Sequence, residues 1–596
     1  MVMAKLGFLP MVCWVVVVTA ALASACSDSG SGVGMDTSPD AWIDGGDASM
    51  DTDADSDADA DTDTDSDTDT DADSDSDSDT LSDGGADGGP DSGPLCVDQD
   101  SDSWCNDMDC DDNDPDVNPS APDVPDNGVD DDCDGVTDET TFIDPSLPAN
   151  VSTYFGGTTD AGRAPQLLYP ENGVLIPTNL MGLKIMWTAG TGNDLWRVEL
   201  DGDAADAVAY VTENWFVPEG ALWDALRFGN MSQAIRIKVT GTTLASPTAK
   251  GESAIVTMNL AEQQVRGGLY YWAASSTTGG DYGIFRYDFD NPGKAAEPVY
   301  TALQLTSPSY PSGRCVACHA LAHNGERMAL NYDGGDGIAD IVAVSNQQSL
   351  VTAGNQYYAN FHTYSPDDSY VLSVYHGVFT LRDGVTGAIV TTPALGGKVT
   401  NPDWSLDGDK VAFTRSTSLF TSDWNFIGGQ IEIMSYTPPS TFGSPSVLVP
   451  AQGGVNFYYP AVSPDGQWVV FNRSTGNSYS NDDATLWVVS VNGGTPIPLT
   501  ALNSVGNLRN SWAKWCPHQQ TLDGKPLFWL TVSSMRNYGH VLQEGNRIPQ
   551  IWMAGFDPER AANGADPSWP AFYLPSQDIT TNNHIPQWTK VVVPLE

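Results

Sequence analysis

From Gly268 to Lys590 the chain repeats one pattern, in which an apolar run, a tight polar turn and a second apolar run follow each other. The five turns are Ala322–Gly325, Ser365–Asp368, Ser405–Gly408, Ser463–Gly466 and Thr521–Gly524. Aspartate or asparagine next to glycine between apolar runs is typical of a β-hairpin. The repeat is about 40 residues long before insertions, and such a period with several strands per repeat indicates propeller blades.

A sixth blade can be assembled from both ends of this region. Apolar runs over 268–272, 284–289 and 299–302 would give three strands, and His584–Trp588 would give the fourth. Closing a ring in this way removes its exposed edge strands. The sequence therefore predicts an all-β fold in which 268–590 forms a six-bladed β-propeller.

The turns and strands of this region resemble the TolB-like propeller family, whose blades carry Ser-Pro-Asp-Gly at the same place. Ser463-Pro-Asp-Gly466 is the most literal match, and the resemblance covers 268–590. It implies a six-bladed propeller that acts at the cell envelope.

Shorter alternating runs precede the propeller. The runs over 183–187, 195–200 and 235–239 are separated by turn residues. Short strands at this spacing predict a small β-sandwich of fibronectin type III kind over 164–262. We expect 140–163 to be a linker.

The N-terminus has the pattern of an export signal. Lys5 precedes an almost wholly apolar stretch over 6–25, and small residues lead to Cys26. This resembles a bacterial lipoprotein signal, which implies that 1–25 is removed and that Cys26 carries a lipid. An uncleaved membrane anchor and ordinary signal cleavage are the alternatives. Ser27 after the cysteine favours the outer membrane or cell surface, so we expect a lipid-anchored protein outside the cytoplasm.

The formal net charge of −54 is concentrated near the N-terminus. Residues 27–139 hold 40 acidic residues and neither lysine nor arginine. Residues 26–95 are too polar to form a core, which predicts a disordered acidic stalk. Weak binding of Ca²⁺ at many of its carboxylates is the alternative. Because no basic stripe is present, nucleic acid is excluded as a partner, whereas divalent cations are expected.

Residues 96–139 have the ligand spacing of calcium loops. Counting from Asp98, carboxylates fall at positions 1, 3, 5 and 12, and a backbone carbonyl falls at position 7. The candidate ligands are Asp98, Asp100, Asp102, Trp104 and Asp109, followed by a second set of Asp130, Asp132, Asp134 and Asp138. Oxygen ligands in this density favour Ca²⁺ over zinc or copper.

The segment resembles the MopE-type metal-binding repeats, which are related to thrombospondin type 3 repeats. The matching runs are 109–113, 118–121 and 132–135. The resemblance implies metal binding; the family's name implies copper, whereas these ligands favour calcium. Of the three possible disulfide pairings we prefer Cys96 with Cys105 and Cys110 with Cys133. An acidic linker without a metal is the alternative.

Cys315-Val-Ala-Cys318-His319 has the attachment pattern of c-type haem. Two thiols would bind the porphyrin and His319 would ligate the iron. Export favours this interpretation, because bacteria attach c-type haem outside the cytoplasm. Two alternatives stay open: a Cys315–Cys318 disulfide beside a packed histidine, and a metal site that includes Cys516 and His518.

Met328 on the following strand is a candidate distal haem ligand. Other candidates are Met535, His323, His362, His376 and His518. We therefore expect a lipoprotein that transfers electrons through one haem to a redox or envelope partner. A haem-free propeller that binds a protein or glycan is the alternative. A hydrolase is least favoured, since neither G-x-S-x-G nor H-E-x-x-H occurs.

Overall fold

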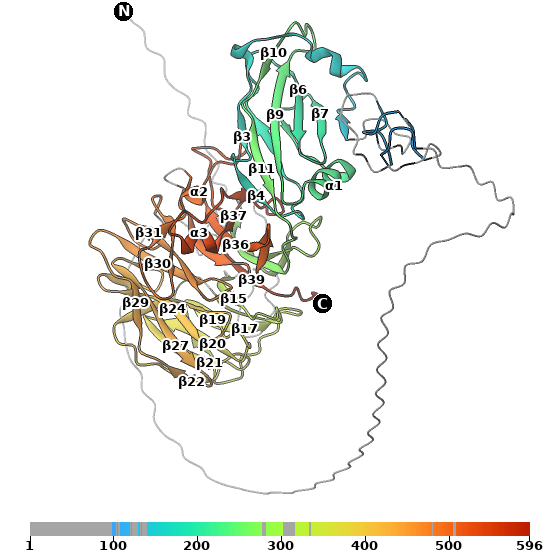
Figure 1. The fold of residues 1–596 in the computed structure, drawn as a ribbon. Helices are drawn as coiled ribbons and strands as arrows, with labels where there is room; N and C mark the ends of the chain where they lie inside the picture. The colour runs from blue at the N-terminus through green and yellow to red at the C-terminus, as the bar shows by residue number, and fades with distance from the viewer. Residues whose placement is uncertain are drawn as a thin grey trace, which may run out of the picture. The chain divides into compact units, whose positions relative to one another are not determined.

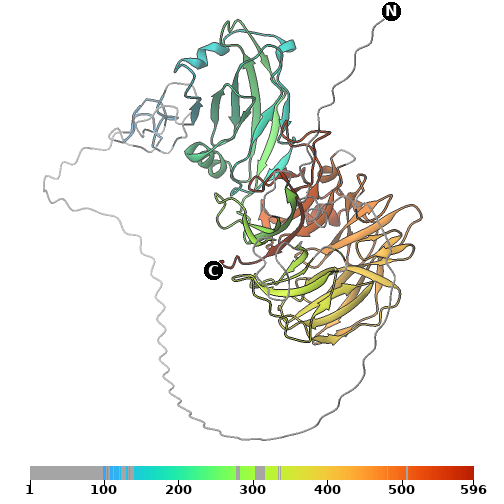
Figure 2. The same ribbon diagram turned by 180° about the vertical axis from the view of Figure 1, so that it is seen from behind.

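The computed structural model describes the chain from Asp98 onward, as Figures 1 and 2 show. It leaves out 103, 105–107, 112, 120, 122–128, 132, 134–139, 277–281, 302–315, 333–334, 336, 480, 505–507 and the side chains of 275–276. The predicted signal, the lipidated Cys26 and the acidic stalk lie outside the described residues. Within the described part, no helix is long and apolar enough to cross a membrane.

The first region after the acidic segment contains two sheets and one helix, α1 (Gly220–Gly229). The larger sheet has the order β1-β7-β6-β9-β10-β2, with β11 pairing β9 and β4; the smaller has the order β3-β5-β8. The bounds are β1 (Thr141–Ile143), β2 (Thr158–Thr159), β3 (Leu167–Tyr169), β4 (Val174–Ile176), β5 (Ile185–Trp187), β6 (Leu195–Asp201), β7 (Ala207–Val211), β8 (Trp215–Phe216), β9 (Ala234–Thr242), β10 (Ala249–Glu252) and β11 (Val256–Leu260). Short 3₁₀ helices cover Val151–Phe155 and Ala161–Arg163.

This region differs from the expected sandwich in two respects. Residues 140–163, expected as a linker, provide β1 and β2, which pair in parallel with β7 and β10. The helix α1 was not predicted; it buries Leu222, Trp223 and Leu226 on one side. Both features depend on partners that lie far along the chain, so no local alternation of apolar and polar residues predicts them.

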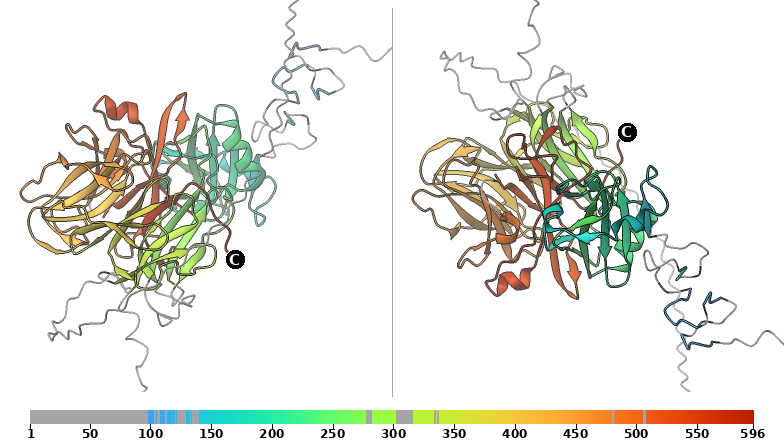
Figure 3. Two further views of the ribbon diagram at one scale, coloured as in Figure 1. Left: turned by 90° about the horizontal axis from the view of Figure 1, so that it is seen from below. Right: turned by 90° about the horizontal axis from the view of Figure 1, so that it is seen from above.

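From Gly268 onward the described strands form six sheets of four or five main strands. Their orders are β14-β13-β12-β39, β15-β16-β17-β18, β19-β20-β21-β22, β23-β24-β27-β28 with β29 on β27, β30-β31-β32-β33, and β34-β36-β37-β38 with β35 on β36. A separate hairpin pairs β25 with β26. Each sheet is antiparallel, and in Figure 3 they follow one another from green through yellow and orange to red.

The strand bounds in the first three sheets are β12 (Gly268–Ser276), β13 (Gly283–Asp288), β14 (Glu297–Thr301), β15 (Val316–Leu321), β16 (Arg327–Tyr332), β17 (Ile338–Ala343), β18 (Tyr357–Tyr358), β19 (Phe361–Tyr364), β20 (Tyr370–Tyr375), β21 (Val378–Asp383) and β22 (Ile389–Thr391). Those of the remaining sheets are β23 (Lys398–Trp404), β24 (Lys410–Ser416), β25 (Phe420–Ser422), β26 (Asn425–Phe426), β27 (Gly429–Thr437), β28 (Thr441–Phe442), β29 (Ser446–Val449), β30 (Asn456–Val462), β31 (Trp468–Ser474), β32 (Thr485–Ser490), β33 (Ile497–Pro498), β34 (Ser511–Trp515), β35 (Gln520–Leu522), β36 (Lys525–Ser534), β37 (Gln550–Phe556), β38 (Phe572–Tyr573) and β39 (Thr581–Thr589). Two short helices are α2 (Thr500–Asn503) and α3 (Pro558–Ala562).

One strand at the end of each sheet contacts the corresponding strand of the next sheet in a closed, propeller-like cycle; these innermost strands are β15, β19, β23, β30, β34 and β39. β15 contacts β19, and contacts continue through β23, β30 and β34 to β39, which contacts β15 again. The C-terminal β39 also pairs antiparallel with β12, so the two ends of the region share one sheet. This pairing confirms the closure that the sequence predicts around His584–Trp588.

The serine and aspartate of the repeated turns have a common role. In the turn after β19, Ser365 Oγ donates to Asp367 Oδ1 at 2.6 Å and accepts from the Tyr370 N–H at 3.0 Å. Ser405 and Ser463 make the equivalent pairs of bonds in their turns. The side chain thus fixes both the turn and the start of the next strand.

The sandwich region and the propeller-like region share one apolar core. The Tyr573 N–H donates to Tyr169 Oη at 3.0 Å, and the Asn179 side chain donates to the carbonyls of Val265 and Phe289 at 2.8 Å. Buried hydrogen bonds of this kind add directional contacts to the apolar packing.

Candidate functional sites

The acidic segment brings three predicted ligands together. One carboxylate oxygen from each of Asp98, Asp100 and Asp102 lies within 4.8 Å of the others. The loop is folded by its own aspartates, since Asp98 Oδ1 accepts from the Ser101 N–H at 2.6 Å and Asp102 Oδ1 from the Trp104 N–H at 2.8 Å. Asp102 Oδ2 is buried and has no hydrogen-bond partner among the described residues. A buried carboxylate oxygen without a partner is costly, which favours a bound cation.

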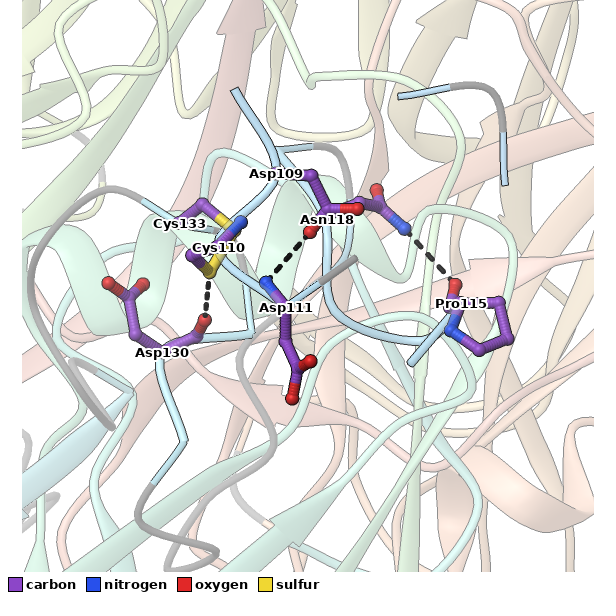
Figure 4. The surroundings of a disulfide bond; sticks show 7 residues. All are labelled: Asp109, Cys110, Asp111, Pro115, Asn118, Asp130 and Cys133. Atoms are coloured by element: carbon purple, nitrogen blue, oxygen red, sulfur yellow. Dashed lines mark hydrogen bonds between the residues drawn. A yellow bond between two sulfur atoms is a disulfide. The ribbon is translucent and has the colours of Figure 1, made fainter. Parts of the chain in front are cut away.

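Asp109 lies at a second position, beside the disulfide shown in Figure 4. Cys110 and Cys133 are bonded, which confirms this predicted pairing. Asp109 is only 8% exposed; its Oδ1 accepts from the Asp111 N–H at 2.9 Å, and its Oδ2 has no described partner. Because the disulfide uses both thiols, no thiolate is available here, and the remaining hard oxygen donors suit Ca²⁺ better than copper.

The described carboxylates of the acidic segment fall into two separate groups. Asp109 is not grouped with the Asp98 trio, and the Asp130 carboxylate belongs to neither described group. The two halves of the segment are joined by the Asn118 N–H, which donates to the Asp131 carbonyl at 2.8 Å. Three predicted ligands lie outside the described residues: Asp132, Asp134 and Asp138. So do Cys96 and Cys105, the second predicted disulfide.

The haem motif lies in the innermost strand β15, where a small cavity of about 40 Å³ opens at the centre of the cycle. Every innermost strand contributes to its wall. The lining residues include Cys318 and His319, Phe361 and His362, Asn401 and Pro402, Tyr459 and Pro460, Trp512 and Ala513, and Ile585. In five of these strands a residue with positive φ stands at this point (Cys318, Asn401, Tyr459, Trp512 and Ile585), where the register shifts by a bulge. Bulges re-aim side chains, here toward the centre.

His319 is almost completely buried beside this cavity. It is 3% exposed, and neither ring nitrogen makes a well-aligned hydrogen bond in the described part of the chain, although the backbone of Tyr270 approaches the ring. Burial lowers the pKa of its imidazole to about 3, so the ring is neutral at physiological pH. The Cys318 thiol is free, and desolvation raises its pKa to about 12. The alternative Cys315–Cys318 disulfide is therefore not formed here, while Cys315 itself lies outside the described residues.

His362 on the neighbouring strand β19 lines the same cavity. It is 6% exposed, and burial followed by the nearby Arg382 charge lowers the pKa of its imidazole to about 3. Its Nε2 lies 3.3 Å from Tyr357 Oη, whereas Nδ1 has no described partner. From the sequence, His362 is only one of several candidate distal ligands of the haem; the order of the sheets brings it to the same cavity as His319.

The donors at this cavity suit haem, but the space does not. A free thiol and an unpartnered imidazole are the groups that c-type haem needs. A cavity of about 40 Å³ holds only a few water molecules, however, and a porphyrin is far larger. Met328 does not line the cavity, because its fully buried side chain belongs to the apolar cluster around Leu330.

The second cysteine-histidine pair is structural. Cys516 is a fully buried free thiol whose pKa burial raises to about 12. His518 Nε2 lies 3.3 Å from the Lys590 carbonyl. Neither residue is among those that line the cavity beside His319. The described residues thus do not assemble the metal site that would join Cys516 and His518 to the haem motif.

A larger groove, of about 520 Å³, lies between β18 and the strands β20, β21 and β22. Tyr358 is 52% exposed there, and its ring centroid lies 5.6 Å from that of Tyr375, which stacks on His376 at 4.0 Å. Exposed Val378 and Ile389 complete its apolar wall. The groove was not predicted from the sequence, in which the aromatic pairs Tyr357-Tyr358 and Tyr375-His376 are its local signal.

Comparison with known proteins identifies one segment. Residues 109–139 match the family model of MopE-type copper-binding repeats, described as a "putative metal-binding motif". Curated proteins give no match to the sequence.

Solved structures give weak likenesses. A protein described as "putative TolB" from Agrobacterium tumefaciens is 13% identical, with 54% of this chain and 98% of that chain covered at a TM-score of 0.29. TolB from Acinetobacter baumannii is 12% identical, with 59% and 79% covered at 0.34. Hydrazine synthase from Kuenenia stuttgartiensis is 13% identical, with 44% and 67% covered at 0.29. TM-scores this low do not assign a fold, so the fold assignment depends on the strand pairing described above.

Proposed function

We propose that this protein is a membrane-tethered, extracytoplasmic binding protein whose propeller binds a neutral glycan and whose acidic segment binds Ca²⁺. The groove with exposed aromatic rings carries this proposal. In this proposal, residues 268–590 form one six-bladed propeller, and residues 164–262 form a β-sandwich that acts as a spacer. The lipid on Cys26 and the stalk over 26–95 hold the binding face away from the membrane, where it meets glycans or envelope proteins.

The chemistry of the groove suits a sugar. Its volume of about 520 Å³ is within the usual range of small-ligand sites, whereas protein partners use broad, flatter surfaces. Sugar rings present C–H faces that pack on aromatic rings, which the series Tyr358, Tyr375 and His376 provides. Gln356 and Thr380 in the wall offer polar groups for sugar hydroxyls.

The charge of the groove favours a neutral sugar over an acidic one. Arg382 is the only permanently charged residue in the wall. Its Nε donates to Ser373 Oγ at 3.0 Å and its Nη1 to the Gly387 carbonyl at 3.1 Å, while the guanidinium lies over the Tyr357 ring. Because these contacts occupy the guanidinium, it is poorly placed to pair with a ligand carboxylate.

Calorimetric titration of the mature protein with a panel of neutral oligosaccharides tests the groove. We expect Tyr358→Ala to weaken binding roughly tenfold, since a lost aromatic contact costs about 1 kcal/mol or more. Phe228→Ala is the matched control, because Phe228 is 44% exposed on α1, outside the groove. Equal affinities in wild type and Tyr358→Ala, or no binding to any sugar of the panel, would refute the glycan site.

A Ca²⁺ titration tests the acidic segment separately. Asp100→Asn and Asp102→Asn should each weaken Ca²⁺ binding roughly tenfold, because each removes one charged oxygen ligand. Asp116→Asn in the same segment is the control, since Asp116 belongs to neither described carboxylate group. Ca²⁺ binding that both ligand variants leave unchanged would contradict the assignment, and so would preferential binding of Cu²⁺.

Covalent haem at Cys315, Cys318 and His319, with electron transfer as its purpose, stays a separate prediction. Its support is the free Cys318 thiol and the unpartnered His319 ring; the small cavity opposes it. Expression in a host with c-type maturation, followed by the visible spectrum of the denatured protein, decides the matter. A haem band in wild type that Cys315→Ser abolishes would establish attachment.

A further inference from the structure

Two of the six innermost strands differ from the others at one position facing the central cavity. β15 and β19 place His319 and His362 there. At the same place β23, β30 and β34 have Pro402, Pro460 and Ala513, and in β39 Ile585 is followed by Pro586. The cycle of contacts makes β15 and β19 direct neighbours. The two histidines therefore lie on neighbouring strands that line one cavity, and no other described residue of its wall is a histidine.

Both imidazoles keep buried nitrogens without a well-aligned hydrogen bond. His319 is 3% exposed and His362 is 6% exposed; both ring nitrogens of His319 and Nδ1 of His362 lack such a bond among the described residues. The backbone of Tyr270 approaches the His319 ring, and that of Cys318 approaches the His362 ring. Leaving buried polar atoms poorly paired is costly, and proline or alanine, as in the other strands, would avoid that cost. The cavity that both rings line thus has the features of a site that a ligand completes.

We propose that His319 and His362 together bind one divalent transition-metal ion, best suited to Zn²⁺, in this cavity. Neutral imidazole nitrogens are preferred ligands of Zn²⁺. A volume of about 40 Å³ accommodates an ion and its remaining water ligands, although it cannot hold a porphyrin.

A hydroxyl group orients one of the two rings. The Tyr357 hydroxyl lies 3.3 Å from His362 Nε2 and holds that ring in place, as outer-shell partners of metal ligands do. Two cations lie near the rings, and each has partners of its own. Lys514 lines the cavity but forms an ion pair with Asp403. The Arg382 guanidinium, whose charge reaches His362, lies over the Tyr357 ring and donates to Ser373 Oγ and the Gly387 carbonyl.

Titration of the metal-stripped mature protein with Zn²⁺ and with Co²⁺ tests the site, in excess Ca²⁺ to occupy the acidic segment. His319→Ala and His362→Ala should each weaken binding roughly tenfold or more and remove the visible Co²⁺ absorption band. Alanine is chosen because Ala513 occupies this place in β34. His540→Ala is the matched control and should bind as wild type does, because His540 does not line this cavity.

Two further variants keep the proposal falsifiable if a histidine variant misfolds. Tyr357→Phe keeps the ring and removes only the hydroxyl beside His362; we expect roughly tenfold weaker Zn²⁺ binding with unchanged melting. Cys318→Ala should retain the site, whereas it would abolish haem attachment. Zn²⁺ binding that both histidine variants and Tyr357→Phe leave unchanged would overturn the proposal. Haem that remains attached after denaturation would also overturn it, because His319 would then serve the iron.

Discussion

Aspartates have different uses in the acidic segment and in the propeller-like region. In the latter, Asp368 accepts from the backbone N–H groups of His323 at 2.6 Å and Asn324 at 3.0 Å, which belong to the neighbouring turn. In the acidic segment, Asp102 and Asp109 each keep one buried oxygen without a described partner. An aspartate side chain thus joins two parts of the fold in the propeller-like region, whereas in the acidic segment it keeps an oxygen that can bind a cation.

The comparison shows why a count of acidic residues does not locate a metal. A carboxylate whose oxygens are used by the chain's own N–H groups has little left for a cation, whereas an unpartnered buried oxygen has no other means of compensation. The regions also differ in what stabilises them. The propeller-like region buries many aromatic residues, whereas Val117 is the one buried apolar residue described in 98–139. So small a segment needs a disulfide or a metal.

The largest expected effect comes from breaking the closure of the propeller-like cycle. Trp588 in β39 is 8% exposed, stacks on Phe289 at 5.2 Å and donates from its indole to Thr531 Oγ1 at 3.0 Å. Trp588→Ala should cost about 3–5 kcal/mol of unfolding free energy, as other buried aromatic deletions do. Denaturant unfolding measures this loss, and Ca²⁺ affinity should stay unchanged. A matching loss of Ca²⁺ affinity would show that the two regions are coupled.

The next effect is confined to the acidic segment. Replacing Cys110 and Cys133 by serine removes the link between its two halves, for which the loop-entropy relation gives about 3 kcal/mol. Hydrogen exchange over 109–133 should become fast and Ca²⁺ binding weaker, while the melting of the propeller-like region stays as in wild type. Protection that persists in the double variant would mean that the carboxylates and their cation hold the segment without the disulfide.

Sequence patterns predicted the local features of both regions. The strands β16, β20, β24 and β31 begin where the repeated turns predict, and before the last three the serine side chain of the turn fixes where the strand starts. The Cys110–Cys133 disulfide and the grouping of Asp98, Asp100 and Asp102 were also predicted, since their residues belong to one short segment of the chain.

Features that depend on distant residues were not predicted. His319 and His362 are brought to one cavity only by the adjacency of β15 and β19, and neither residue's neighbours along the chain indicate it. The groove around Tyr358 combines two sheets in the same way. The strands in 140–163 escaped notice because their parallel partners lie many residues away.

The smallest expected effect tests the contrast between the two kinds of aspartate. Burial alone would raise the pKa of Asp368, but the hydrogen bonds from His323 and Asn324 outweigh it and lower the pKa below its ordinary value. A carboxylate with a lowered pKa stabilises the fold above about pH 4, the pKa of the unfolded chain, and this contribution is lost as the pH falls through the folded-state pKa. Asp368→Asn should therefore cost about 1–2 kcal/mol at pH 7 and less in acid.

Denaturant unfolding with and without Ca²⁺ separates Asp368 from the acidic segment. The cost of Asp368→Asn should be the same in both conditions, because its partners are the chain's own N–H groups. Asp102→Asn should lower the stability of the acidic segment only when Ca²⁺ is present, since its Oδ2 has no described partner to lose. Asp523→Asn, in an exposed turn, should change stability by less than about 0.5 kcal/mol. An effect of Asp102→Asn that persists in chelator would mean that this carboxylate, like Asp368, serves the fold itself.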